Sequence, residues 1–111
     1  MNSFQIWQGD RLPWLPFTLE RPDGSMMPRA GVLGVRFRFK GQGTELAALP
    51  AMEAPCVLTD ALFLVGRFEW SAEHTATAGL FLGFFVVDTA QGTHTVPGDR
   101  PVRITIAPKP F

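Results

Sequence analysis

The sequence predicts an all-β protein folded as a single antiparallel β-sandwich. Three observations support this prediction. Short runs of alternating apolar and polar residues recur along the chain, combinations of Pro, Gly and Asp separate them, and no long segment has helical periodicity. With 111 residues, the chain is expected to form one domain over residues 1–111, which is large enough to bury a core.

The first two predicted strands lie within residues 4–19. Phe4–Trp7 is a short lead strand, and residues 15–19 alternate apolar with other residues. Pro13 and Pro16 cannot donate to a strand ladder, so the second strand is expected at a sheet edge or at a bulge. The sequence Pro-Asp-Gly-Ser at 22–25 then predicts a turn.

Residues 35–40 predict a half-buried strand with one cationic face. Apolar side chains alternate there with basic ones, Val35, Phe37 and Phe39 facing the core and Arg36, Arg38 and Lys40 facing solvent. The segment 44–54 is less regular and predicts a short strand and an irregular loop. Helix is expected only as a turn near residues 44–49 or 71–75.

The second half of the chain predicts three further strands and a hairpin. Residues 62–70 form one strand, in which Gly66 indicates a bulge or a close packing partner. Residues 80–87 form another, and a turn at 90–92 connects it to a strand at 93–96. Pro, Gly and Asp at residues 97–101 predict a turn. The alternation of apolar and polar residues that follows predicts the last strand around Ile104.

The inward positions of these strands define the expected core. They are apolar residues that alternate with polar ones or lie in fully apolar runs: Leu15, Phe17, Leu19, Val35, Phe37, Phe39, Phe68, Trp70, Phe81, Phe85, Val87, Ile104 and Ile106.

Charge and terminal sequence exclude several classes of partner and location. Ten basic and ten acidic residues give a formal net charge of zero, so nothing favours nucleic acid or an anionic membrane as a partner. The N-terminus lacks the basic and apolar regions of a signal peptide, and no apolar run is long enough to span a membrane. The expected location is the cytoplasm, unless the protein leaves the cell within a larger particle.

Residues capable of chemistry are few and scattered. The single cysteine, Cys56, excludes an internal disulfide and is expected to be a small buried hydrophobe. His74 and His94 are too few for a zinc site, and no nucleophile motif surrounds Ser71 or Cys56. The sequence therefore predicts no enzymatic activity, no catalytic residue, no metal and no cofactor.

The strand at 80–87 carries the strongest indication of an interaction. It is apolar on both faces, so one face is expected in the core and the other, formed by Leu80, Leu82, Phe84 and Val86, in an interface. The alternative is that residues 41–58 cover this second face within the same chain. A second functional hypothesis is carbohydrate binding by exposed rings of Trp7 and Trp14, whereas Trp70 is expected in the core.

Two stretches resemble a known family. The first is Ile6-Trp-Gln-Gly-Asp-Arg-Leu-Pro-Trp-Leu-Pro-Phe-Thr-Leu-Glu-Arg-Pro-Asp-Gly24, in which Gly-Asp precedes a proline-containing strand and an Asp-Gly turn. The second begins at Trp70 and continues with Glu-His-Thr-Ala-Thr-Ala-Gly at 73–79, aromatic residues at 81 and 85, and Gly92-Thr followed by Thr95-Val-Pro-Gly. Together they resemble the N-terminal domain of phage baseplate upper proteins and small phage or prophage proteins built from it.

This resemblance implies a fold and a role. The fold would be immunoglobulin-like, and the chain would be a structural protein of a virion, in its tail, baseplate or neck. It would act by docking on copies of itself or on neighbouring phage proteins, first in the host cytoplasm and then in the virion.

Overall fold

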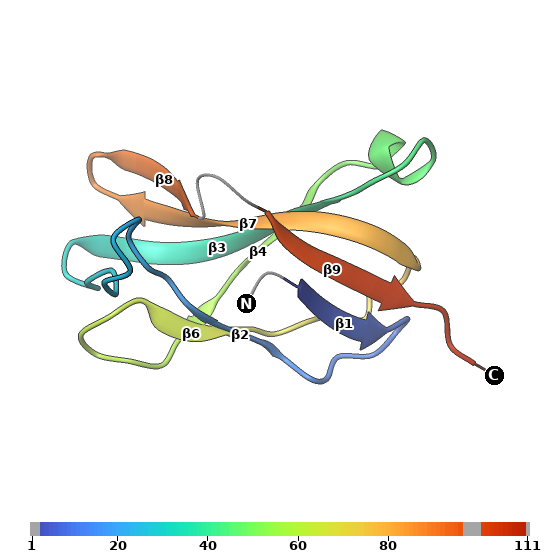
Figure 1. Cartoon of the computed structure of the whole chain (residues 1–111), viewed down its shortest axis with the longest axis horizontal. Coiled ribbons are helices and arrows are strands. Elements are labelled where there is room, and N and C mark those ends of the chain that lie inside the picture. The colour runs from blue at the N-terminus through green and yellow to red at the C-terminus, as the bar shows by residue number, and fades with distance from the viewer. Residues whose placement is uncertain (1–2, 97–100, 111) are drawn as a thin grey trace.

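The computed structural model describes residues 3–96 and 101–110, and it is almost entirely β-structure (Figure 1). The predicted all-β class is confirmed, and the only helical element in the described ranges is one 3-10 turn, η1 (Leu46–Ala48). Residues 97–100 of the turn expected at 97–101 lie outside the described residues. The strands are β1 (Ser3–Trp7), β2 (Leu15–Thr18), β3 (Val32–Gly41), β4 (Met52–Pro55), β5 (Val57–Leu58), β6 (Val65–Phe68), β7 (Gly79–Thr89), β8 (Gly92–Val96) and β9 (Val102–Ala107).

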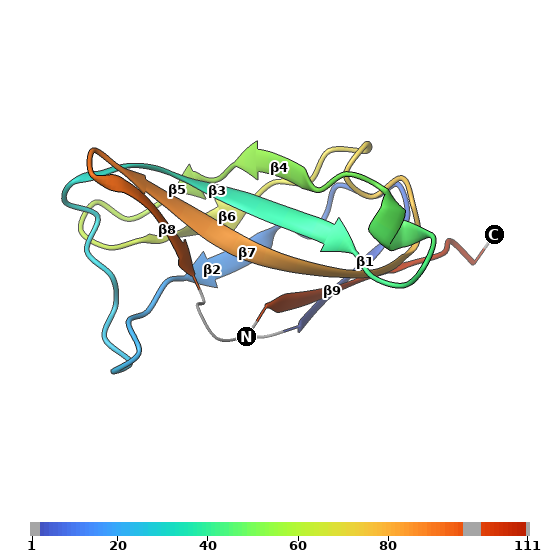
Figure 2. The same ribbon diagram turned by 90° about the horizontal axis from the view of Figure 1, so that it is seen from above.

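These strands form two sheets that face one another (Figures 1 and 2). The large sheet has the order β1-β9-β7-β3-β4, and the small sheet has the order β2-β6-β5. Strand β8 pairs with one end of β7, whereas β9 pairs with the other end. All pairings are antiparallel except that of β1 with β9, which is parallel.

The proline-containing strand lies where its sequence predicts. β2 is an edge strand of the small sheet, because it pairs with β6 on one side only among the described residues. The irregular segment 44–54 contains η1 and then β4, which pairs with β3 at the edge of the large sheet. Directly after β4, the chain crosses to the small sheet at Cys56 and continues as β5.

All of the expected core residues are buried. The core also contains four residues that the sequence analysis did not include in it: Ile6, Leu64, Val96 and Val102. The described part of the chain contains no helix that is long and apolar enough to cross a membrane.

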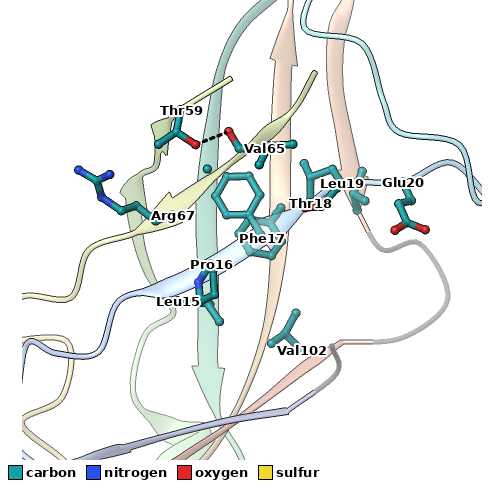
Figure 3. Close-up of a pocket in the computed structure, with 13 residues that line it drawn as sticks. Leu15, Pro16, Phe17, Thr18, Leu19, Glu20, Thr59, Val65, Arg67 and Val102 are labelled. Atoms are coloured by element: carbon teal, nitrogen blue, oxygen red, sulfur yellow. Dashed lines mark hydrogen bonds between the residues drawn. The ribbon is translucent and has the colours of Figure 1, made fainter. Parts of the chain in front are cut away.

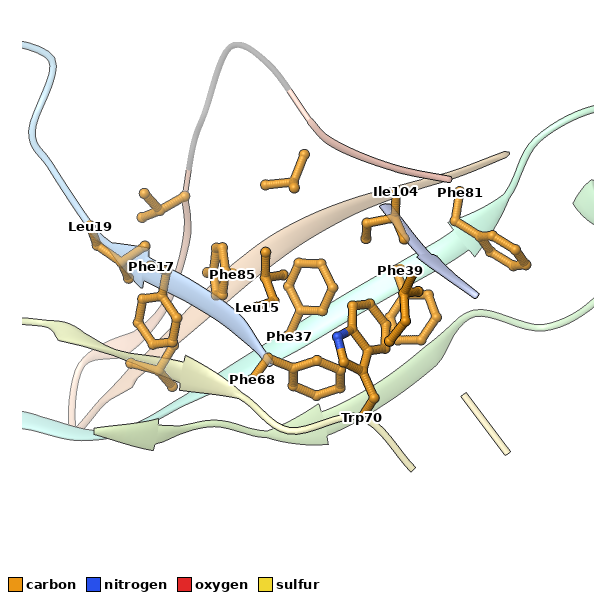
Figure 4. Packing of buried hydrophobic residues seen from close by; sticks show 14 of the residues in the cluster. Leu15, Phe17, Leu19, Phe37, Phe39, Phe68, Trp70, Phe81, Phe85 and Ile104 are labelled. Atoms are coloured by element: carbon orange, nitrogen blue, oxygen red, sulfur yellow. The ribbon is translucent and has the colours of Figure 1, made fainter. Parts of the chain in front are cut away.

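An aromatic cluster joins the two sheets at the centre of the core (Figure 4). The Phe37 ring of β3 lies 4.8 Å from that of Phe85 in β7 and 5.0 Å from that of Phe68 in β6, centroid to centroid. Trp70 meets the Phe68 ring edge-on at 5.0 Å. Gly83 makes room for this packing, because a Cβ atom there would collide with the Phe37 ring.

Truncation of the central ring should destabilise the protein strongly. Phe37 has no exposed surface, so Phe37→Ala is expected to lower the free energy of unfolding by about 3–5 kcal/mol. The total free energy of unfolding of a native protein is typically about 5–15 kcal/mol. Chemical denaturation measures the change, with Leu33→Ala, at a 76% exposed position, as the control. A loss below about 1 kcal/mol for Phe37→Ala would contradict the packing described here.

The close packing partner expected for Gly66 is the backbone of β5. A Cβ atom at position 66 would collide with the carbonyl oxygen of Val57, which cannot move without disturbing the strand pairing. Gly66→Ala is therefore expected to lower the thermal midpoint by several degrees. Gly34→Ala is the matched control, since a Cβ atom there meets nothing within 4 Å. Equal midpoints for the two variants would show that β5 does not approach Gly66 this closely.

Candidate docking face

The central strand of the large sheet has one face in the core and an apolar outer face. Successive side chains of a strand point to opposite sides, so Phe81, Phe85 and Val87 are buried. The intervening residues, Leu80, Leu82, Phe84 and Val86, lie on the outer face and are called the β7 stripe below. Leu80 is 42% exposed, and the other three are half-buried.

Basic side chains border the β7 stripe on both sides. In the strand register, Leu82 lies between Lys40 of β3 and Arg103 of β9. Phe84 lies beside Arg38, and Val86 beside Arg36. Long basic side chains at such positions can lay aliphatic carbons along an apolar row while their charged ends reach water.

One of these basic residues is neutralised within the sheet. Arg36 donates two hydrogen bonds to Asp88, from Nε to Oδ2 at 2.7 Å and from Nη2 to Oδ1 at 2.8 Å. Its third donor, Nη1, bonds Glu53. The bonds from Arg36 hold the pKa of Asp88 below its ordinary value, and both acidic partners raise the pKa of Arg36. The charge at the Val86 end of the stripe is therefore balanced.

The positive charge is less balanced in the middle of the stripe. Arg38 lies 3.7 Å from Glu53, a carboxylate already bonded to Arg36. Within the described ranges, Lys40 forms no salt bridge. The surface around Leu82 and Phe84 thus combines apolar side chains with excess positive charge.

The segment 41–58 does not cover the β7 stripe. Strand β4 runs beside β3 at the sheet edge, and η1 lies near the end of β3 (Figure 2). The Leu46 side chain of η1 packs against the core, beside Gly41 and Gly79. The intramolecular cover considered as the alternative is therefore not formed.

The two candidate carbohydrate-binding tryptophans have different neighbours. Trp7 is 45% exposed at the end of β1, beside an ion pair between Asp10 and Lys109 (2.7 Å). Trp14 is 41% exposed, and the guanidinium of Arg67 covers one face of its ring at 4.2 Å from the centroid. Trp14 does not line the small pocket that Trp7 forms with Asp10, Lys109 and Pro110, and sugar binding stays a prediction.

A cavity that the sequence analysis did not predict lies beside the edge strand β2 (Figure 3). Its volume is about 770 Å³, and Leu15, Phe17 and Val102 form part of its apolar lining. Among the described residues, its ionisable lining residues are Glu20 and Arg67. Within the described ranges, no cysteine or histidine lines this cavity, so it does not offer a set of soft metal ligands.

His74 has a structural role in the turn before β7. Its Nδ1 accepts a hydrogen bond from the backbone N–H of Ser71 at 3.0 Å, and its ring packs against Phe39 and Phe68. The Ser71 hydroxyl accepts from the backbone N–H of His74 and makes no bond to the imidazole. Ser71 and His74 therefore do not form a nucleophile–base pair.

The other candidate ligands are no better placed for chemistry. Cys56 is half-buried, and burial raises the pKa of its thiol to about 12, which keeps it protonated and unreactive at neutral pH. His94 is exposed on β8. Over residues 3–96 and 101–110, no three side chains of His, Cys, Asp or Glu gather as a metal site would require.

Thr75 is a fully buried polar residue that sequence reasoning did not single out. Its hydroxyl donates to the carbonyl oxygen of Asp10 at 2.9 Å, and its own carbonyl accepts from the N–H of Gly9 at 2.9 Å. The two bonds join the turn before β7 to the turn after β1. Nothing in the local sequence distinguishes Thr75 from Thr77, because the bonds depend on a segment about 65 residues away.

Comparison with known proteins does not extend this description. No protein-family model, no curated protein and no solved structure matches the chain.

Acid should destabilise the fold through His74. Partial burial lowers its pKa below the ordinary 6.5, although the nearby Glu73 carboxylate opposes the shift. Because the folded state favours neutral His74, its contribution is complete above pH 6.5 and is lost as the pH falls from there through the lower folded-state pKa. The thermal midpoint should therefore fall between pH 8 and pH 5.

The variant His74→Asn separates this effect from general acid sensitivity. The amide oxygen of asparagine can accept the Ser71 N–H bond but does not titrate. The variant should show a smaller fall in thermal midpoint over the same pH interval. An identical fall in both proteins would assign the pH dependence to other groups.

Proposed function

We propose that this chain is a non-enzymatic structural protein of a phage or prophage particle, with an immunoglobulin-like fold. It acts by docking the β7 stripe on a neighbouring protein of the tail, baseplate or neck. The observation that carries this proposal is the apolar outer face of β7 itself. An apolar row at the centre of an otherwise polar sheet surface is typical of an interaction site.

Strand order supports the immunoglobulin-like assignment. In that fold, strands B, E and D form one sheet, and strands C, F and G form the core of the other. The small sheet has the order β2-β6-β5, and on this proposal these strands would correspond to B, E and D. In the large sheet, β3, β7 and β9 would correspond to C, F and G, with β4 beside β3 and β1 beside β9.

The two stretches that resemble the phage family meet in space. Asp10 belongs to the first stretch and Thr75 to the second, and the Thr75 hydroxyl bonds the Asp10 carbonyl oxygen. Gly9, in the first stretch, bonds the Thr75 carbonyl oxygen. The motif residues therefore form one structural corner. Contact between the two stretches is expected if both match the same domain family, and it supports the resemblance.

The β7 stripe is large enough to hold a specific contact. Full burial of a Leu, Val or Phe side chain contributes about 1.5–3 kcal/mol, so four such residues give at most about 6–12 kcal/mol. The stripe residues are already partly covered, which lowers this value, and association costs several kcal/mol more. A weak to moderate contact is the expected result, strengthened where many subunits assemble together.

The proposal predicts that the chain purifies with phage particles. Particles induced from the cell that encodes it should contain the chain in fixed ratio to the other structural proteins, as measured by mass spectrometry. Leu82→Glu with Phe84→Lys should reduce its incorporation by about tenfold or more, since two charges would enter the contact. Circular dichroism and thermal melting establish that the variant is folded.

A matched control replaces two leucines elsewhere. Leu12 and Leu62 are 63% and 71% exposed, and Leu12→Lys with Leu62→Glu introduces the same two charges away from β7. This control should be incorporated like the wild type. If the wild-type chain is recovered only in the cell extract and not in particles, the virion role is wrong. If only the control variant fails to be incorporated, the contact does not involve the β7 stripe.

A further inference from the structure

The β7 stripe forms an apolar band on the outer face of the large sheet that is one strand wide. Leu82 has Lys40 on one side and Arg103 on the other, and Leu80 has Thr105 as its neighbour on β9. Adjacent strands lie about 4.8 Å apart, so the polar rows of β3 and β9 are separated by about 10 Å. A partner sheet packed here would also bury these polar rows, which is costly for unpaired charges.

A single α-helix fits a band of these dimensions. A helix with its side chains is about 10–12 Å across, which matches the separation of the polar rows. From Leu80 to Val86 the strand rises about 20 Å at about 3.3 Å per residue. That length corresponds to about 13 helical residues at 1.5 Å each, or nearly four turns.

The charge around the band specifies the flanks of that helix. The outer-face positions of β3, β4, β7, β8 and β9 carry four basic residues (Arg36, Arg38, Lys40 and Arg103) and two acidic ones (Glu53 and Asp88), a net charge of +2. The whole chain has a net charge of zero, so this face is more positive than the rest of the molecule. Carboxylates on a partner would find complementary charge beside Leu82 and Phe84.

A second copy of this chain is a poorer occupant. Two copies stacked through the same face would bring the basic rows of β3 and β9 close to each other, and like charges in an interface cost free energy. The described part of the chain also contains no α-helix that could serve as the docking element.

We propose that the β7 stripe receives one amphipathic α-helix of a different protein, with an apolar stripe about four turns long and Asp or Glu residues on its flanks. This inference rests on the docking role proposed above and adds the chemistry of the partner. The apolar residues of the helix would lie along Leu80–Val86, and its carboxylates would reach Arg38 and Lys40 on one side and Arg103 on the other.

A pair of synthetic peptides tests the proposal. Both are helix-forming peptides of about 14 residues with the same leucine stripe, flanked by Glu in one and by Lys in the other. Fluorescence anisotropy with the whole chain should show at least about tenfold tighter binding of the Glu peptide at low ionic strength. Raising the salt to about 0.5 M should reduce this preference.

Charge reversal on the protein sharpens the test. Arg38→Glu with Lys40→Glu should weaken binding of the Glu peptide at least tenfold and strengthen binding of the Lys peptide. Arg11→Glu with Arg21→Glu changes the net charge equally at exposed loop positions and should leave both affinities unchanged. Leu80→Glu, at the most exposed position of the stripe, should weaken both peptides without unfolding the protein.

Several results would overturn this inference. Equal binding of the two peptides would show that the partner does not need acidic flanks. If neither peptide binds, the proposed helical occupant is wrong. A wild-type dimer that Leu82→Glu with Phe84→Lys dissociates would assign the face to a second copy. Tighter binding of a single-stranded oligonucleotide, lost in the Arg38 and Lys40 variant, would assign it to nucleic acid.

These failures are distinguishable from failure of the docking role. If the particles require an intact β7 stripe but neither peptide binds, the docking role stands and the helical occupant is wrong. If the chain is absent from particles, the virion role is wrong whatever the peptides do.

Discussion

The contact of the Phe37 ring with both sheets is the interaction on which the rest of the structure depends. Phe37 belongs to the large sheet, and it packs against Phe85 of the same sheet and Phe68 of the small one. This packing is possible because Gly83 has no side chain where the Phe37 ring lies. The cluster fixes which face of β7 points inward, and because of the two-residue period of a strand it also fixes the outward position of the β7 stripe.

Much of the fold was predictable because its strands have two chemically different faces. The alternation around Phe37 assigned core and solvent sides correctly, and Pro16 correctly predicted an edge strand. Residues 80–87 do not alternate, yet their neighbours and the glycine at 83 distinguish the inner face from the outer one once the sheet is formed. The sequence also predicted that Leu80, Leu82, Phe84 and Val86 share the face opposite the core, although not that the basic row of β3 lies beside them.

What the sequence could not predict depends on contacts between distant segments. Nothing local to β1 indicates that it pairs with β9 in parallel, or that the chain changes sheets at Cys56. The charge balance of the docking face also depends on partners far apart, since Arg36 meets an aspartate 52 residues away. Alternation predicts that Arg36 faces outward, whereas only strand register determines whether its charge is neutralised.

The parallel pairing of β1 with β9 has a mechanical consequence. The two strands run in the same direction and are bonded in register from Ser3 with Arg103 to Trp7 with Ala107. Tension applied to the start of β1 and the end of β9 would therefore slide one strand along the other. Sliding loads the bonds of the ladder together, whereas peeling breaks them one at a time. A domain linked to its neighbours through these two strands would resist extension along its length.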